Sequence, residues 1–92
     1  MNLPLRKRIE EVCKDCGIEE EIIIQFMKEE WIQPIDPEHN MFDDEDMARI
    51  SLIEDLRQEF GINDEAIPVI LHLIDQLNDL HRKLSPKTVG FT

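Results

Sequence analysis

The sequence lacks a long apolar run, since none approaches the roughly 18 residues that a membrane-spanning helix needs. Its start shows no charged segment followed by an apolar stretch and a small-residue cleavage site, so we expect no secretory signal. Two cysteines are too few for a disulfide scaffold. With 92 residues, we expect a single domain over 1–92 with a modest core, in the cytoplasm.

Residues that carry catalysis or hold cofactors are also scarce. The three glycines stand far apart, at positions 17, 61 and 90, so the chain has no glycine-rich phosphate loop. Neither of the two serines, Ser51 and Ser85, has a His–Asp pair near it in the sequence. We therefore expect no enzyme and no cofactor.

Cys13 and Cys16 form a C-x-x-C pair, a spacing that zinc and redox sites share. A structural zinc ion needs four ligands, and the other candidates, His39, His72 and His81, are not in paired spacing. A thioredoxin-like site needs a βαβ context, which the sequence does not predict. Because both cysteines fit the apolar stripe of the first predicted helix, core packing without a metal is favoured. A small metal or thiol sensor is the alternative.

Basic residues are missing where acidic residues are dense. The net charge of −11 is concentrated in residues 9–48, which hold 14 acidic and two basic residues and so carry −12. Residues 1–8 carry +3 and residues 49–92 carry −2. Such a block repels a phosphate backbone and attracts a basic protein surface. The alternative is a solvated face that confers only solubility.

Apolar spacing predicts four helices. The first runs from Ile9 to Cys16 and ends at Gly17, and the second begins about three residues later, so 9–30 has helix-turn-helix spacing. Two prolines at 34 and 37 exclude a helix over 31–42, where we expect an extended, two-stranded wing that closes at Met41 and Phe42.

The third helix is predicted over 44–60, with Asp43 or Asp44 as its N-cap. The four acids from Asp43 to Asp46 lack the glycine and the closing glutamate of a calcium loop, which favours a helix start over a metal site. The apolar stripe of this helix consists of Met47, Ile50, Ile53, Leu56 and Phe60.

The fourth helix is predicted over 63–84, with Asn63 as its cap, a bend at Pro68 and a tail over 85–92. It has two apolar stripes, the first formed by Ile67, Leu71 and Ile74. The second, which we call the heptad seam, consists of Ala66, Ile70, Leu73, Leu77, Leu80 and Leu84. Because heptad spacing is typical of paired helices, we expect a homodimer formed through this seam.

The order of helix-turn-helix, wing, third helix and heptad helix resembles the MerR-type winged-helix fold. The residues that carry this resemblance include Gly17-Ile18, Trp31-Ile32-Gln33-Pro34 and Asp46-Met47-Ala48-Arg49-Ile50. Residues 9–84 are similar, more specifically, to the chaperone-modulator CbpM family, above all in Gly61-Ile62-Asn63-Asp64-Glu65 and Asp75-Gln76-Leu77. The resemblance implies a mainly α, MerR-like winged helix-turn-helix with a long C-terminal heptad helix. It also implies a non-enzymatic inhibitor that binds the J-domain of a curved-DNA-binding co-chaperone.

The chain departs from a DNA-binding MerR-type domain at three positions. Such a domain carries an arginine and an aromatic residue where Ile24 and Gln25 stand here, and an arginine where Asn40 stands. Phosphate and base contacts need such donors, so the departures favour protein binding over the alternative, a DNA-binding MerR-family transcriptional regulator.

We expect the acidic block to dock on a basic J-domain helix, with Ile24 as the apolar centre of the contact, or Trp31 if its ring is exposed rather than in the core. The candidate contact residues are Glu19, Glu20, Glu21, Ile24, Glu29, Glu30, Trp31, Asp43, Asp44, Glu45 and Asp46.

Overall fold

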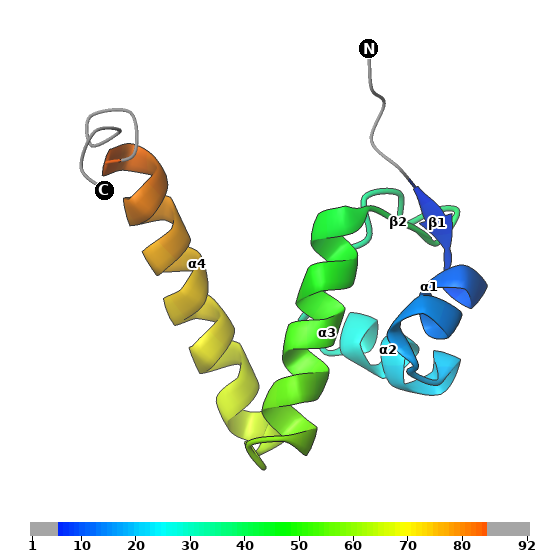
Figure 1. Ribbon diagram of the computed structural model, residues 1–92, viewed down its shortest axis with the longest axis horizontal. Coiled ribbons are helices and arrows are strands. Elements are labelled where there is room, and N and C mark those ends of the chain that lie inside the picture. Colours follow the sequence, from blue (N-terminus) through cyan, green and yellow to red (C-terminus); the bar gives the residue numbers. More distant parts are fainter. Residues whose placement is uncertain (1–5, 85–92) are drawn as a thin grey trace. The chain divides into compact units, whose positions relative to one another are not determined.

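The computed structural model describes residues 6–84, so the predicted tail over 85–92 lies outside the described residues (Figure 1). The elements are β1 (Lys7–Arg8), α1 (Ile9–Cys16), α2 (Glu20–Lys28), β2 (Met41–Phe42), α3 (Asp44–Gln58), a short 3-10 helix η1 (Asp64–Ala66) and α4 (Ile67–Leu84). The predicted mainly helical, winged fold class is confirmed. The chain divides into two compact units, Met1–Ile62 and Asn63–Thr92.

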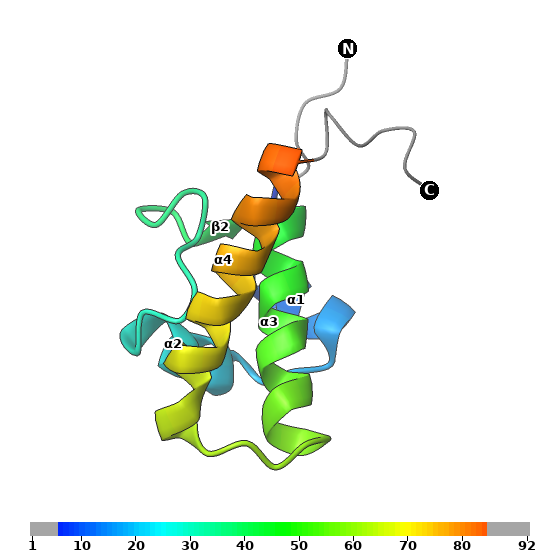
Figure 2. The same ribbon diagram turned by 90° about the vertical axis from the view of Figure 1, so that its left-hand side faces the viewer.

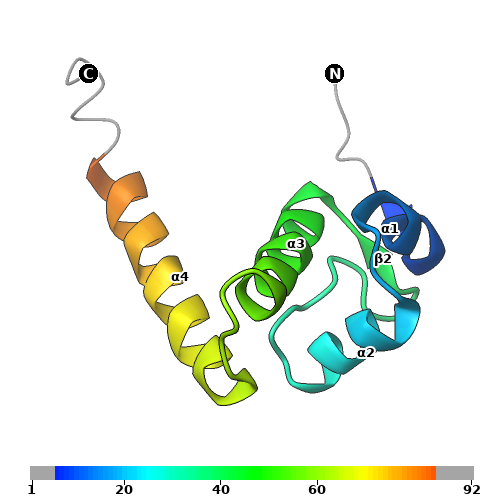
Figure 3. The same ribbon diagram turned by 60° about the horizontal axis from the view of Figure 1, so that its bottom comes forward.

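Helices α1 and α2 form the helix-turn-helix of the first unit (Figure 3). Helix α1 ends where Gly17 adopts a left-handed conformation with φ 69°, which glycine accepts without a steric penalty. The Gly17 amide then donates a 2.8 Å hydrogen bond to the carbonyl of Cys13, and the Ile18 amide donates to the same oxygen at 3.1 Å. This tight turn sends the chain into α2 within three residues.

The wing differs from the prediction. β2 pairs antiparallel with β1, with Lys7 opposite Phe42 and Arg8 opposite Met41, so the partner strand lies before α1 rather than within 31–42. Within that segment there is a single bridge, between Asp36 and Met41, at the base of a tight turn. Figure 2 shows the loop that leaves α2 and returns to β2. A two-residue strand leaves no periodic pattern, so the sequence could not reveal the pairing partner.

Helix α3 is capped as expected but ends early. Asp43 is its N-cap, and Ile50 and Ile53 are fully buried on its inner face. The prediction that Phe60 belongs to this stripe is wrong, because α3 ends at Gln58 and Phe60 is 70 % exposed. Beyond the helix, the Ile62 amide donates a 2.9 Å hydrogen bond to the Leu56 carbonyl, which reverses the chain direction.

The core of the first unit collects apolar residues from both helices of the helix-turn-helix, from the loop after α2, from β2 and from α3. Its buried members are Ile9, Val12, Ile18, Ile23, Phe26, Trp31, Ile32, Phe42, Ile50 and Ile53. Arg49 ties α3 to the loop, since its Nε donates a 2.9 Å hydrogen bond to the Trp31 carbonyl.

The second unit begins with a 3-10 turn before α4. Asn63 precedes η1 but makes no side-chain cap hydrogen bond, so the predicted cap is wrong. Because the 3-10 turn takes up the first residues, Pro68 is the second residue of α4, where an N–H would lack a helical partner anyway. Ile67 and Leu71 are buried, whereas Leu73, Leu77, Leu80 and Leu84 of the heptad seam are 51–65 % exposed. No helix in the described part of the chain is long and apolar enough to cross a membrane.

Candidate protein-interaction surface of the helix-turn-helix

Helix α2 begins with exposed carboxylates and buries one face of its length. Ile23 and Phe26 are fully buried on the inner side. Glu20 and Glu21 are exposed in the first turn, and Glu19 is exposed directly before it. The N-terminal end of a helix attracts anions through its unpaired N–H groups, so these carboxylates occupy the place where a DNA phosphate would otherwise be favoured.

The remaining outer positions of α2 offer little for reading bases. Ile24 is half-buried, and the Gln25 amide donates a 2.9 Å hydrogen bond to the Glu29 carboxylate four residues on. Lys28, in the last turn, is the single basic residue of this helix. The α2 surface thus has a carboxylate-rich start, three half-buried apolar side chains, Ile22, Ile24 and Met27, and one cation at its end.

Trp31 is not available as the apolar centre of a contact, because the condition that its ring be exposed is not met. Only 6 % of Trp31 is exposed, and its ring packs on Phe26 with ring centroids 5.6 Å apart. The residue follows α2 directly, where the chain turns back over the helix, and packing there removes the ring from solvent. Ile24 is the one predicted apolar candidate that keeps some exposure.

The chain leaves α2 through a Schellman motif that is closed by a glutamate. The Trp31 amide donates to the Phe26 carbonyl and the Glu30 amide to the Met27 carbonyl, both at 3.0 Å. This pattern places Glu30 in the left-handed region with φ 63°, where glycine is the usual residue. The left-handed conformation costs a residue with a side chain roughly 1–2 kcal/mol of conformational free energy, so the backbone of Glu30 is strained.

Two of the four acids around the start of α3 have structural tasks. The Asp46 amide donates a 2.8 Å hydrogen bond to Asp43 Oδ1, and the Asp43 amide donates in return to Asp46 Oδ2 at 3.0 Å. The same Asp46 oxygen accepts from the Ile35 amide at 2.9 Å, which ties the wing loop to the helix. Partial burial raises the pKa of Asp46, against the effect of these two hydrogen bonds. Asp44 and Glu45 remain exposed.

Several cations of the first unit are engaged within it. Lys7 forms an ion pair with Asp15. The Arg57 guanidinium lies 3.4 Å from Glu54 and 5.5 Å from the centre of the Phe26 ring. With Arg49 bound to the Trp31 carbonyl, three of the basic groups therefore support the fold rather than offset the acidic surface.

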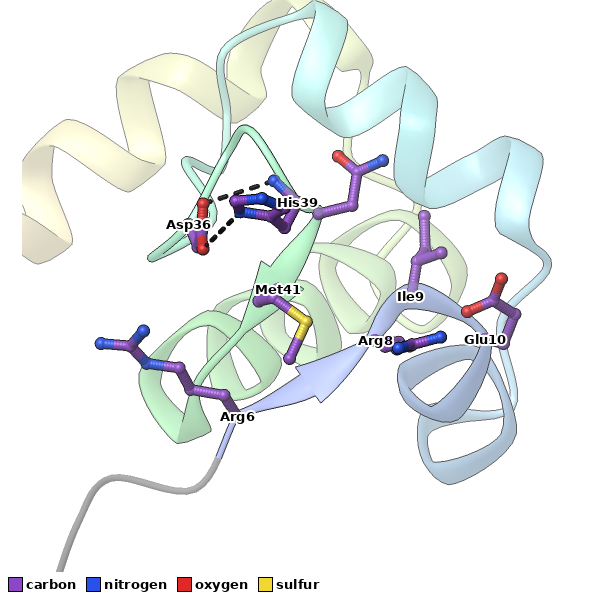
Figure 4. A pocket seen from close by; sticks show the side chains of 8 residues that line it. Arg6, Arg8, Ile9, Glu10, Asp36, His39 and Met41 are labelled. Atoms are coloured by element: carbon purple, nitrogen blue, oxygen red, sulfur yellow. Dashed lines mark hydrogen bonds and ion pairs between the residues drawn. The ribbon is translucent and has the colours of Figure 1, made fainter.

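One hollow of the first unit has walls of mixed charge. It encloses about 540 Å³ and is lined by Arg6, Arg8, Ile9, Glu10, Asp36, His39, Asn40 and Met41. Figure 4 shows Asp36 held by two contacts to His39, one to its backbone amide at 3.3 Å and one to its ring Nδ1 at 3.0 Å. The pKa of Asp36 is lowered mainly by its hydrogen bonds to His39 and further by the charge of Arg6.

A second hollow lies at the end of α2. It encloses about 380 Å³ and is lined by Met27, Glu30, Ile32, Gln33, Pro34 and Pro37. Apart from the two prolines, no signal in the sequence marks these residues as neighbours around a concave surface, so the sequence does not predict this hollow.

The two cysteines lie on α1, half-buried and without a disulfide between them. Burial raises the pKa of the Cys13 thiol, and the Glu20 and Glu10 carboxylates raise it further. A raised pKa keeps this thiol protonated at neutral pH, which lowers its reactivity. Within residues 6–84, no three His, Cys, Asp or Glu side chains are grouped so that they could hold a metal ion.

The sequence pattern of the MerR HTH family regulatory proteins matches residues 8–86 of the chain. The match therefore covers both the helix-turn-helix and the long last helix. No curated protein matches the chain.

Proposed function

The chain belongs to the family of MerR HTH regulatory proteins, and on that premise we propose that it is a non-enzymatic, cytoplasmic regulator that binds a basic protein surface. The partner we propose is the J-domain of a curved-DNA-binding co-chaperone, which the chain inhibits. The similarity of residues 9–84 to chaperone modulators supports this choice of partner.

The acidic start of α2 is the observation that carries the proposal. A helix-turn-helix that binds DNA brings its second helix to the major groove and needs cations for the phosphates. Here Glu19, Glu20 and Glu21 stand at that helix end, and each is exposed. Carboxylates at this place oppose a phosphate backbone and favour Lys and Arg side chains of a protein.

Binding of the chain to a purified J-domain at several salt concentrations tests the proposal. We expect the affinity to fall between about 0.01 and 0.15 M salt, because the Debye length shrinks from about 30 to 8 Å over that range. Absence of binding to the J-domain would contradict the proposal. A mobility shift of duplex DNA at low salt would instead favour a DNA-binding regulator, the alternative that the family itself offers.

Self-association through α4 is the second part of the proposal. The heptad seam spans nearly three heptads from Ala66 to Leu84, and its four leucines, over positions 73–84, are exposed. Monomers rarely leave such a surface open to water. A homodimer would cover it. A monomer in sedimentation at micromolar concentration would contradict this part and leave the J-domain part untouched.

A further inference from the structure

Burial of Trp31 leaves the proposed protein contact without an obvious apolar centre. Exposed charges at the rim of an interface speed encounter and fix register but add little affinity. Most of the affinity of protein interfaces comes from a few large side chains, above all Trp, Tyr and Arg, that enter well-packed pockets. The structure must therefore supply a concave apolar surface near the acidic residues, if the contact is to be specific.

The hollow at the end of α2 has the size and the composition of such a pocket. Its volume of about 380 Å³ exceeds the roughly 150 Å³ that suffices for a benzene ring in an apolar cavity, so one large side chain fits. Ile32, only 3 % exposed, is among its apolar lining residues, and the half-buried Met27 thioether adjusts to different shapes. Pro34 and Pro37 hold their backbones at fixed φ, so the wall is formed before a ligand arrives.

Glu30 gives this pocket a negative rim. Its carboxylate has no hydrogen bond or ion pair with any residue that the structure describes, whereas the neighbouring Glu29 carboxylate accepts from Gln25. The Glu30 backbone occupies a left-handed position that glycine would fill with less strain. The one basic residue of α2, Lys28, does not line the hollow. An apolar floor with a single carboxylate at the edge fits an apolar side chain that is flanked by Lys or Arg.

We propose that the hollow lined by Met27, Ile32, Pro34 and Pro37 receives one large apolar side chain of the basic protein partner, and that Glu30 pairs with a Lys or Arg beside it. This inference rests on the proposed function, since the occupant belongs to the proposed partner. In this proposal the hollow, rather than Trp31, provides the apolar centre of the contact.

A pair of charge-matched variants tests the role of Glu30 against the purified J-domain. Glu30→Gln should weaken binding about two- to fivefold, the range expected of one rim pair. Glu38→Gln removes the same charge from an exposed residue of the same loop outside the hollow and should leave the affinity within about twofold. Equal affinities of these two variants would overturn the role of Glu30.

Glu30→Gly separates binding from stability. Glycine relieves the left-handed backbone, so the melting temperature should rise by about 2–6 °C while binding weakens as in Glu30→Gln. If Glu30 served only the fold, the affinity of Glu30→Gly would rise or stay the same as its stability rises. Unchanged or tighter binding by Glu30→Gly would therefore overturn the proposal.

A synthetic probe tests the pocket independently of the J-domain. The probe is a helical peptide of about 18 residues built from Lys and Leu, and the control peptide carries Ser in place of Leu. We expect the Lys/Leu peptide to shift the Met27 and Ile32 methyl resonances, the control peptide to shift neither, and Glu30→Gln to reduce the shifts.

The two experiments fail in distinguishable ways. A J-domain that binds equally to the wild type and to Glu30→Gln, with no peptide shift at Met27 or Ile32, refutes the pocket and leaves the proposed function standing. Absence of J-domain binding with peptide shifts at these methyls refutes the choice of partner and supports a pocket for basic, apolar segments.

Discussion

The first unit and helix α4 use apolar side chains differently. In the first unit, Phe26 and Ile53 are fully buried and the start of α2 exposes carboxylates. On α4, by contrast, Leu73 and Leu77 are 57 and 65 % exposed. Burial of apolar side chains stabilises the first unit, so its surface can carry charged residues. The exposed leucines of α4 instead form an apolar surface that suits a second helix.

The largest expected effect comes from truncating the core of the first unit. Phe26→Ala should reduce the free energy of unfolding by about 3–5 kcal/mol, because it opens a cavity and removes the ring that contacts Trp31 and Arg57. Val69→Ala on α4, where the side chain is 59 % exposed, should change it by less than about 0.5 kcal/mol. Urea unfolding measures both values.

A milder core variant keeps this comparison measurable if Phe26→Ala leaves too little folded protein. Ile23→Val, at a fully buried position, should reduce the free energy of unfolding by about 0.5–1.5 kcal/mol. An equal loss in the free energy of unfolding at the buried and the exposed positions would contradict the contrast between the two regions.

The second effect concerns the heptad seam. Leu77→Glu should raise the dissociation constant of the proposed homodimer by about a hundredfold or more, because pairing would bury a carboxylate between apolar side chains. Asn78→Glu adds the same charge at the next position, outside the seam, and should leave the dimer intact. Sedimentation equilibrium distinguishes the two, and dissociation by both variants alike would argue against a contact confined to the seam.

The third effect concerns the acidic start of α2. Replacing both Glu20 and Glu21 by Lys should slow association with the J-domain about tenfold at low salt and leave dissociation nearly unchanged, because exposed charges act mainly on encounter. Ile24→Ala should instead speed dissociation. Stopped-flow or surface-based kinetics measure both rates.

The control for these rates is a double variant with the same change in charge. Asp55→Lys with Glu59→Lys alters exposed residues near the end of α3, which do not belong to the helix-turn-helix. An equal slowing by this control would show that the net charge of −11 acts as a whole and that the location on α2 does not matter.

The smallest effect is the pH dependence of stability at Asp46. Its pKa is raised above the usual value of 3.8 by burial, so the folded state holds this proton more tightly than the unfolded chain. Stability from this group is therefore greatest below pH 3.8 and decreases as the pH rises through the folded pKa. Asp46→Asn keeps an acceptor for the Asp43 and Ile35 amides, so its stability relative to wild type should improve with rising pH across that window.

Asp36 provides the opposite control. His39 and Arg6 lower its pKa below 3.8, so the stability it contributes is present above that value and is lost as the pH falls through the folded pKa. The stability of Asp36→Asn relative to wild type should thus be lowest at neutral pH and highest in acid. Thermal unfolding between pH 2.5 and 7 checks both signs, and parallel curves for the two variants would contradict the assignment.

The amino-acid sequence by itself determined the helices and the charge of the surface. The apolar spacing, with Gly17 as a stop and Asp43 as a cap, is local, so it places α1 and the start of α3 without knowledge of the rest of the chain. The acidic start of α2 follows from residue identity and the predicted start of the helix. Phe60 was misplaced because it extends the periodic stripe beyond the point where the helix ends.

Only the tertiary structure decided which segments meet. Pairing of β1 with β2 joins residues separated by the whole helix-turn-helix and the loop after α2, and strands of two residues carry no period that could reveal it. Burial of Trp31 depends on how the chain folds back over Phe26, and the hollow beside Glu30 depends on two prolines and a left-handed backbone acting together. Hydrophobic burial is non-directional, so composition identifies candidate contact residues while chain geometry selects which of them remain exposed to a partner.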